Sequence, residues 1–244
     1  METRQIKLLH LYYDLMNLYG DWANVAVLER ELFYRGFEVR TDKKSVGDDI
    51  GFGLYDFIFI GSGTERSQVA CVRDLQRFKE AFFERIEAGI PTLATGNSHE
   101  LFGTAVTDCK GKRHEALGLL DFKTEQQSTR VTGDCVCIPK APLCNDKLIG
   151  FINRAGGSQI GDIERPFSIE PGEGAGFAAC DEGIIHKNLL GTYMTGPILV
   201  RNPPLMMYFA DLITGEMSKG KRENNDTFFM YQEMAYLSAV DKIK

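Results

Sequence analysis

The sequence lacks several features that would place it in a specialised class of protein. Its 244 residues contain no apolar run long enough to cross a membrane, and the N-terminus lacks the profile of a signal peptide. The 28 Lys and Arg residues are outnumbered by 34 Asp and Glu residues, which gives a net charge of −6 at pH 7. Neither nucleic acid nor an anionic membrane is therefore expected as the main partner. We expect a cytoplasmic protein that does not insert into membranes.

The cysteine pattern gives little support for a disulfide framework or a metal centre. Six cysteines in a cytosolic chain of this length are expected to be reduced thiols. Cys135 and Cys137 lie in an alternating stretch, so both would share one strand face. A zinc site that joins this pair to Cys144 and His114 is an alternative, but the CxC spacing lacks the turn geometry of CxxC. Buried core thiols are favoured, and we predict no metal site and no cofactor.

What is present is the composition of an ordinary globular domain. Hydrophobic residues make up 43% of the chain and charged residues 25%, which is typical of soluble proteins with a well-covered core. No internal repeat, low-complexity tract or interdomain linker is visible. We expect a single domain over residues 1–244 that ends in a helical tail at about residues 222–244.

The first hundred residues alternate between strand and helix patterns. Asp21 is the expected cap of the first helix, and Gly36 and Gly89 are expected to end the two helices. Such alternation predicts an α/β fold with a doubly wound, mostly parallel, flavodoxin-like sheet. The expected strands are residues 6–13, 37–41, 55–60 and 90–95, and the expected helices are residues 21–35 and 67–88.

After Gly103 the pattern changes to short strands with few helix signals. These strands predict an antiparallel extension at the edge of the sheet, followed by a helix over residues 203–214. In the tail, Phe228, Tyr231, Met234 and Leu237 recur at helical spacing. Such a stripe packs more often on its own domain than on a partner. The expected strands are residues 117–122, 128–138, 148–153, 183–188 and 190–197.

The chain is organised around residues 90–103, where an apolar run ends in the turn Gly96-Asn97-Ser98 and a short helical pattern follows. Strand, sharp turn and helix are the parts of a nucleophile elbow, which aims a Ser or Cys side chain away from the end of a sheet. The residue at the tip is Gly96, which has no side chain to attack a substrate. This stretch therefore has the pattern of a catalytic platform without its nucleophile.

Further blocks occur in a fixed order between Ile6 and Leu212. They are Tyr19-Gly20-Asp21 with Asn24, Gly61-Ser62-Gly63 with Gln68, the elbow at 94–103, Gly118-Leu119-Leu120-Asp121 with Thr124, Arg130-Val131-Thr132-Gly133-Asp134, Gly150-Phe151 with Asn153, Gly156-Gly157, Glu182-Gly183, Lys187-Asn188, residues 191–197 and Asn202. With these blocks the chain resembles the class I glutamine amidotransferase-like proteins of the cobyric-acid-synthase (CobB/CobQ) type. The resemblance implies glutamine as the family's nitrogen source.

Two departures from the family decide what activity can be expected. The resemblance implies a cysteine nucleophile at the position of Gly96 and a histidine base at the position of Thr195. Glutamine hydrolysis needs a thiolate to attack the carboxamide and an imidazole to handle the proton. Glycine offers no nucleophile, and a threonine hydroxyl is no general base near neutral pH. We predict that no catalytic residue of this dyad is intact, which leaves open whether the chain is an enzyme.

Parts of the binding apparatus are expected to remain. The resemblance implies that backbone N–H groups near Gly61 to Gly63 and after Gly96 form an oxyanion hole. It further implies that Arg130 holds the glutamine α-carboxylate. It also implies a Mur-ligase-like, ATP-dependent ligase as the partner subunit, in the amidation of a peptidoglycan precursor. The predicted ligand-binding residues are Gly61, Gly63, Gln68, Gly96, Asn97 and Arg130.

Two other functions stay open on the sequence. The chain can be a module that binds or senses glutamine or glutamate without covalent chemistry. It can also be a hydrolase or transferase with a relocated nucleophile such as Ser98, although a Ser at the start of a helix is more often a cap. His99 falls where the family has an aromatic residue, which favours a packing role. The loop Gly61-Ser62-Gly63-Thr64 lacks the Lys of a phosphate-binding P-loop.

Overall fold

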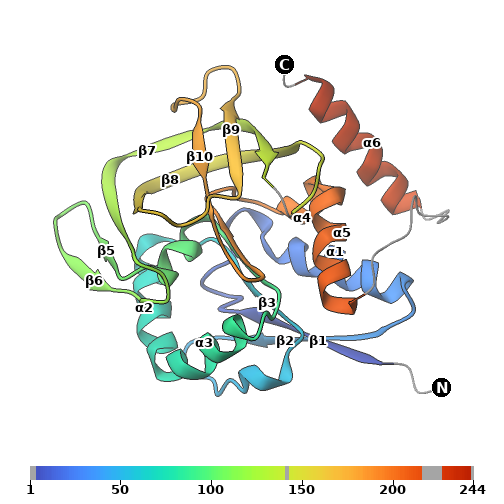
Figure 1. Ribbon diagram of the computed structural model, residues 1–244, viewed down its shortest axis with the longest axis horizontal. Coiled ribbons are helices and arrows are strands. Elements are labelled where there is room, and N and C mark those ends of the chain that lie inside the picture. Colours follow the sequence, from blue (N-terminus) through green and yellow to red (C-terminus); the bar gives the residue numbers. More distant parts are fainter. Residues whose placement is uncertain (1–3, 141–142, 216–226, 243–244) are drawn as a thin grey trace.

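A computed structural model describes residues 4–140, 143–215 and 227–242 of the chain. In these ranges the strands form two six-stranded sheets, which lie next to each other with helices packed on the first (Figure 1). The first sheet has the order β11-β12-β4-β3-β1-β2 and is parallel except for β11. Its strands are β1 (Gln5–Leu11), β2 (Glu38–Lys44), β3 (Phe57–Ile60), β4 (Thr92–Thr95), β11 (Ile184–His186) and β12 (Leu189–Thr192).

Helices cover both faces of the first sheet, because its central strands are apolar on both sides. Ile6 and Leu8 of β1 belong to one buried cluster, and Leu9 and Leu11 belong to a second cluster on the opposite face. The first cluster is covered by α1 (Trp22–Tyr34), α4 (Ile198–Arg201) and α5 (Pro203–Thr214), and the second by α2 (Glu65–Leu75) and α3 (Lys79–Glu87). Continuous apolar strands of this kind are typical of doubly wound parallel sheets. The predicted fold class is confirmed.

The second sheet is built on two long antiparallel strands, β7 (Phe122–Pro139) and β8 (Leu148–Ile160). Their register shifts between Gln126 and Val131, and this irregularity places Arg130 beside the first sheet's loops. The remaining strands are β5 (Ala105–Thr107), β6 (Arg113–Glu115), β9 (Phe167–Pro171) and β10 (Cys180–Glu182). At the edge of the first sheet, β11 is the strand that pairs antiparallel. The long strands β7 and β8 do not extend that edge, as was expected, but form this separate sheet.

Other expectations differ in detail. The helix expected over residues 67–88 is interrupted by the 3-10 turn η3 (Gln76–Phe78), where Phe78 leaves the helical backbone region with φ −120° and ψ 12°. Residues 117–118 are irregular and residues 119–121 form bends instead of the predicted strand, which begins at Phe122. Two short 3-10 helices, η1 (Leu18–Gly20) and η2 (Phe52–Leu54), lie in loops. None of the described helices is long and apolar enough to cross a membrane.

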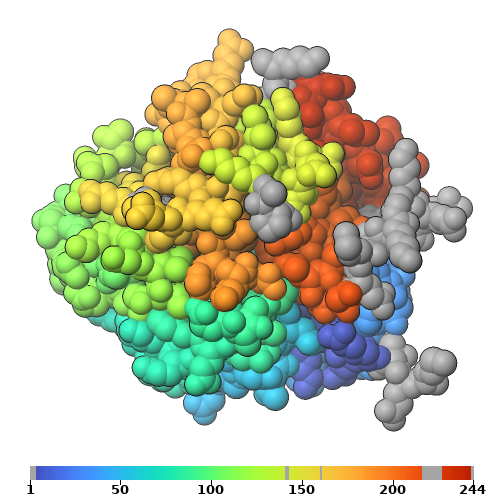
Figure 2. Space-filling view, viewed as in Figure 1, coloured from blue at the N-terminus to red at the C-terminus, as the bar shows by residue number. Residues whose placement is uncertain are grey.

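The C-terminal helix α6 (Thr227–Lys242) turns a different face to the protein from the one predicted. It packs on α4, α5 and β8 through Phe229 and Tyr236, together with Gln232. The stripe that was expected to pack on the domain is exposed, with Tyr231 61% and Met234 57% accessible. Figure 2 shows α6 in red at the surface. The prediction was wrong because Phe229 lies one position from the predicted stripe, so apolar spacing alone does not choose the face. Residues 222–226 and 243–244 of the predicted tail lie outside the described residues.

The carboxyl ends of the parallel strands meet in one place. The loop after β3 holds Gly61, Ser62 and Gly63, the chain after β4 begins with Gly96, and the segment after β12 leads to Thr195. In open α/β sheets the crevice outside these ends is where ligands bind. The predicted site residues near Gly96 are therefore positioned by the first sheet.

Candidate functional site

Gly96 lies at the tip of a sharp turn between β4 and the 3-10 helix η4 (Gly96–Phe102). Its φ of +60° is in the left-handed region, which favours glycine. A Cβ atom at this position would lie 2.7 Å from the Cβ of Ser62 and would overlap its Oγ. The Cγ2 of Thr195 would be 3.3 Å away. The space that the side chain of a nucleophile would need is therefore filled by Ser62.

Ser62 is held in this position by a buried carboxylate. The backbone N–H of Ser62 donates to Oδ2 of Asp21 at 2.5 Å, and Asp21 is completely buried. Burial raises the pKa of Asp21 from 3.8 to about 7, against the opposing effect of the hydrogen bond from Ser62. Asp21 occupies the N-cap position of α1 as predicted, but its side chain makes no capping hydrogen bond to the helix. Its place in the site follows from the tertiary contact with Ser62, which spacing along the chain does not reveal.

The loop amides expected to form an oxyanion hole have internal partners. Gly63 donates its N–H to Oδ1 of Asn97 at 3.0 Å, so the side chain from the elbow caps the loop. The Ser62 N–H is taken by Asp21. A donor can stabilise an oxyanion only if it is free to point at the developing charge. In this structure, both of these N–H groups are satisfied without a ligand.

Thr195 stands where the resemblance implies a histidine base. Its backbone N–H and its hydroxyl both donate to the carbonyl oxygen of Phe151, at 2.9 Å and 3.1 Å. The residue is buried, and its hydroxyl proton already has an acceptor. These contacts tie the segment after β12 to β8 and provide no general base at the elbow.

Arg130 reaches the site from the irregular part of β7. Its Nη1 donates to Oε1 of Glu65 at 2.5 Å, and its Nε donates to Oδ1 of Asn153 at 2.6 Å. Its Nη2 donates to the carbonyl oxygen of Asn153 at 2.9 Å. Asn153 in turn donates to the hydroxyl of Tyr19 at 2.9 Å. Arg130 is therefore brought to the same place as the elbow, but its guanidinium already has three acceptor contacts.

A buried polar network lies beneath the elbow and was not predicted from the sequence. Glu100 is completely buried, and its carboxylate accepts hydrogen bonds from Gln68 at 2.7 Å and from the hydroxyl of Tyr193 at 2.9 Å. Gln126 donates to Oε1 of Gln68 at 3.0 Å. Burial raises the pKa of Glu100 above its usual range. Glu100 follows Gly96 by four residues, which is the only signal in the sequence that it lies near the elbow.

These groups surround a narrow pocket at the carboxyl ends of the first sheet. The space open to the centre of a water molecule is about 10 Å³, enough for about one water. Of the residues predicted to bind ligand, Gly63, Asn97 and Arg130 line this pocket, whereas Gly61, Gly96 and Gln68 do not. The side-chain amide of Gln68 donates instead to Glu100 and to the carbonyl oxygen of Asn97. The lining residues are Tyr19, Ser62, Gly63, Glu65, Asn97, Glu100, Gln126, Arg130, Asn153, Ala155, Gly156 and Thr195.

Comparison with known proteins agrees with this architecture. The sequence profile of the CobB/CobQ-like glutamine amidotransferase domain matches residues 7–203. The chain belongs to this family. Among curated proteins, it is 32% identical over 207 residues to the GatD subunit of lipid II isoglutaminyl synthase (glutamine-hydrolyzing) from Staphylococcus aureus, covering 85% of this chain and 84% of that one. The protein of the same name from Streptococcus pneumoniae is 32% identical over 203 residues, covering 82% and 77% of the two chains.

Solved structures of glutamine amidotransferases share the fold at lower identity. A crystal structure of a glutamine amidotransferase matches 84% of this chain and 98% of its own, with a TM-score of 0.56 and 15% identity. One from Thermotoga maritima matches 96% of this chain and 92% of its own, with a TM-score of 0.55 and 12% identity. The resemblance stated from the sequence blocks is therefore confirmed at the level of the family and its fold.

Within the family's elbow, Ser98 was considered as a relocated nucleophile. Its hydroxyl is buried and is within hydrogen-bond distance of the carbonyl oxygens of Ile60 at 2.9 Å and Thr95 at 2.8 Å. The Nδ1 of His99 lies 2.8 Å from the carbonyl oxygen of Gly96, and its ring packs edge-on against Tyr193. Burial lowers the pKa of His99 to about 4. Ser98 and His99 therefore face the interior beside the strands, and neither lines the pocket.

The residues of the alternative zinc site lie in two places. Cys135 and Cys137 are buried with their Sγ atoms 3.8 Å apart, on one face of β7 as the alternation predicts. His114 lies on β6, where its Nε2 is 3.4 Å from a carboxylate oxygen of Asp108. Within the described ranges, no group of three or more His, Cys, Asp or Glu side chains is arranged to hold a metal ion.

Proposed function

We propose that this chain is a non-hydrolysing glutamine amidotransferase-like subunit that partners a Mur-ligase-like, ATP-dependent ligase in amidating a peptidoglycan precursor. The observation that carries the proposal is the elbow, where Gly96 supplies no nucleophile and Ser62 fills the space beside it. Thioester formation from glutamine needs a sulfur in that position and a base near Thr195. Neither group is present in the sequence at these positions.

The partner and the substrate class are inferred from the relatives. Both curated relatives are named as the GatD subunit of lipid II isoglutaminyl synthase, and each alignment covers more than three quarters of both chains. A subunit that keeps the fold can still contribute structure or regulation to the ligase. In that case free ammonium, rather than glutamine, is the source of nitrogen.

The test is to purify the complex of this chain with its Mur-ligase-like partner and to measure amidation of lipid II with glutamine or with ammonium. We expect turnover with ammonium, little turnover with glutamine, and a loss of ligase stability or activity when this chain is omitted. Glutamine-dependent amidation that rises in proportion to the amount of this subunit would contradict the proposal. Failure of the two chains to associate would contradict the proposal that the ligase is the partner of this chain.

A second function, the binding of an amino acid without chemistry, is favoured by one observation. Arg130 lines the pocket with its side chain 42% exposed. A guanidinium can bind a carboxylate through two hydrogen bonds whether or not a reaction follows. Calorimetry with glutamine and glutamate tests this function. Absence of heat at millimolar ligand, with Arg130→Ala indistinguishable from wild type, would remove glutamine and glutamate as ligands.

A further inference from the structure

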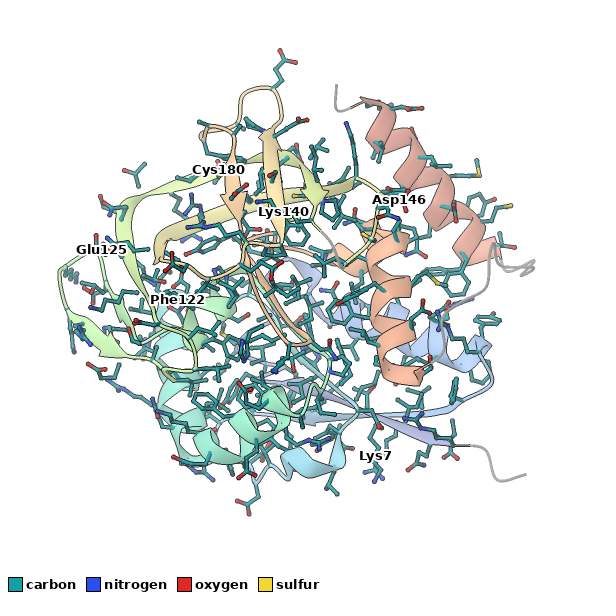
Figure 3. The ribbon with its side chains drawn as sticks, in the orientation of Figure 1. Lys7, Phe122, Glu125, Lys140, Asp146 and Cys180 are labelled. Carbon is teal, nitrogen blue, oxygen red and sulfur yellow. The ribbon has the colours of Figure 1, made fainter. Side chains whose placement is uncertain are left out.

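The outward face of α6 carries large apolar side chains. At about 100° of rotation per residue, Met234 points nearly opposite to Phe229 and Tyr236, which pack on the rest of the protein. A hydrogen bond fixes this orientation, because the hydroxyl of Tyr236 donates to the carbonyl oxygen of Lys147 at 2.5 Å. Figure 3 shows the neighbouring Asp146 beside α6, on the side of the protein body. The apolar outward face is therefore a fixed feature of the surface.

This face continues onto α1 through a row of aromatic rings. The ring of Tyr34 lies 5.4 Å from that of Phe229 on α6, and the ring of Phe33 lies 5.8 Å from that of Tyr34. We call the combined area the α1–α6 surface, and its large side chains are between 37% and 67% exposed. They are Phe33, Tyr34, Phe228, Met230, Tyr231, Met234 and Leu237. If a fully exposed side chain of this size has about 200 Å², these residues together expose about 700 Å² of largely apolar surface.

An apolar surface of this size indicates an interface with another protein chain. The largest apolar patch of a typical monomeric protein covers about 300–600 Å². A stable protein–protein interface buries about 800 Å² on each partner, and its core is enriched in Tyr, Phe and Met. The α1–α6 surface exceeds the first value and approaches the second, and it consists mainly of these residue types. It is therefore large enough to form one half of a stable interface.

The outward stripe of α6 is complementary to a second copy of itself. Its residues are arranged symmetrically about Met234, with Tyr231 and Leu237 three positions away and Met230 and Ser238 four positions away. When two such helices pair antiparallel across a twofold axis, Met234 faces its own copy. Tyr231 of each helix then faces Leu237 of the other. A stripe that is symmetric about its midpoint meets this requirement of a twofold interface.

The charges at the two ends of α6 also favour antiparallel pairing. Near the N-terminal end of α6, the guanidinium of Arg30 lies over the ring of Phe228, 4.6 Å from its centroid, and Arg30 is exposed. Near the C-terminal end, Asp241 is exposed on the same side of the helix as the stripe, whereas Glu233 and Lys242 lie on its two flanks. Antiparallel pairing brings Arg30 of one copy toward Asp241 of the other. Parallel pairing would bring like charges together.

We propose that the α1–α6 surface is the interface of a homodimer, in which the α6 helices of two copies of this chain pair antiparallel across Met234. The family profile matches residues 7–203, so α6 lies outside the part of the chain that the profile shares. A partner common to the family is expected to contact the shared part, whereas a second copy of this chain always presents α6. The inference is independent of the proposed function, because no residue of the α1–α6 surface lines the pocket at the elbow.

Sedimentation equilibrium of the full chain at micromolar concentration tests the homodimer. Wild type is expected to have the mass of a dimer. Met234→Glu and Leu237→Glu are each expected to raise the Kd of the dimer about thirtyfold or more, because each places two carboxylates in an apolar interface. The matched control is Leu54→Glu, which should leave the Kd unchanged. Leu54 is 61% exposed on η2, which contacts α3 on the face of the first sheet opposite to α6.

A mixture of two charged variants tests the twofold pairing itself. Met234→Glu and Met234→Lys are each expected to be monomeric, whereas their mixture should form a heterodimer, because position 234 of one copy faces position 234 of the other. Melting curves establish that the variants are folded, and if the Met234 variants are not, Leu237→Glu against Leu54→Glu decides the proposal. Monomeric wild type, a dimer that survives all the α6 substitutions, or a mixture that stays monomeric would each overturn it. Loss of ligase binding in these variants, with monomeric wild type, would assign the surface to the ligase instead.

Discussion

The inner end and the mouth of the pocket differ in burial and in how their polar groups are paired. At the inner end, Asp21, Ser62 and Glu100 are buried; the backbone N–H of Ser62 donates to Asp21 and Glu100 accepts from Tyr193, while Oδ1 of Asp21 and Oγ of Ser62 have no hydrogen-bond partner among the described residues. At the mouth, Arg130 and Glu65 are partly exposed and pair with each other. A buried polar group is costly to release from its partner, whereas an exposed ion pair exchanges partners readily. The inner end is therefore tightly fixed, whereas the charged groups at the mouth can exchange partners.

The largest effect is expected from adding a side chain at the elbow. Gly96→Ala would place a β-carbon in the left-handed region and against Ser62, so we expect a loss of about 4 kcal/mol in the free energy of unfolding. Urea unfolding measures it. In the double variant with Ser62→Gly, the stability lost through overlap with Ser62 should be recovered, whereas the stability lost through the left-handed backbone should not. A double-mutant cycle separates these two contributions. A neutral Gly96→Ala would show that the space beside the elbow is open.

The next effect is a pH dependence at the inner end. The pKa of Asp21 is raised from 3.8 to about 7, so between these values the folded chain keeps a proton that the unfolded chain has released. Stability contributed by this group is complete below about pH 4 and is lost as the pH rises to about 7. Asp21→Asn should remove a dependence of about 3–4 kcal/mol over this window.

The measurement is chemical unfolding of wild type and Asp21→Asn across the same pH range. His10 and His99, with pKa values lowered to about 4, act in the opposite direction, since they favour folding as the pH rises toward 6.5. They are present in both proteins, so the difference between the two profiles isolates Asp21. Parallel profiles would show that Asp21 is ionised in the folded protein throughout this range.

A smaller effect is expected from the network beneath the elbow. Tyr193→Phe removes the hydroxyl that donates to Glu100 at 2.9 Å, and leaves a buried carboxylate oxygen without that donor. We expect a loss of about 1–2 kcal/mol. The control is Tyr231→Phe on α6, because Tyr231 is 61% exposed and such surface changes stay within about 0.5 kcal/mol. Equal effects of the two substitutions would contradict the network's contribution.

The smallest effect on stability is expected at the mouth. Arg130→Ala breaks the contacts with Glu65 and Asn153, yet its side chain is 42% exposed. We expect a loss below about 1 kcal/mol. A loss of unfolding free energy as large as that of Gly96→Ala would mean that Arg130 holds the two sheets together. It would also contradict the expectation that substitutions at the mouth cost less stability than substitutions at the inner end.

The sequence predicted the parts of this protein that depend on short-range pattern. Continuous apolar strands and amphipathic helices identify the doubly wound sheet, and the Gly96 turn identifies its functional edge. The second sheet was harder to predict, because pairing of β7 with β8 depends on residues far apart in the chain. The exposed face of α6 was missed because both of its faces carry apolar residues, Phe229 on one and Met234 on the other.

The same division holds for the site. The prediction that Gly96 and Thr195 replace a nucleophile and a base depends on single residues, which the sequence gives directly. The filling of the elbow by Ser62 is not, because it depends on the distance between two loops that follow different strands. Likewise, the contact of Glu65 with Arg130 joins α2 to the stretch of β7 where the register shifts. Contacts between separate elements of this kind need the folded structure.

The most direct test of the central claim is release of ammonia from glutamine by the purified chain in complex with the Mur-ligase-like subunit proposed as its partner. Hydrolysis is followed with glutamine labelled at the amide nitrogen, and the same preparation is treated with an electrophilic glutamine analogue. The account predicts no ammonia above a control without the complex and no covalent adduct on this chain. Sustained ammonia release with an adduct on any residue of this chain would contradict it.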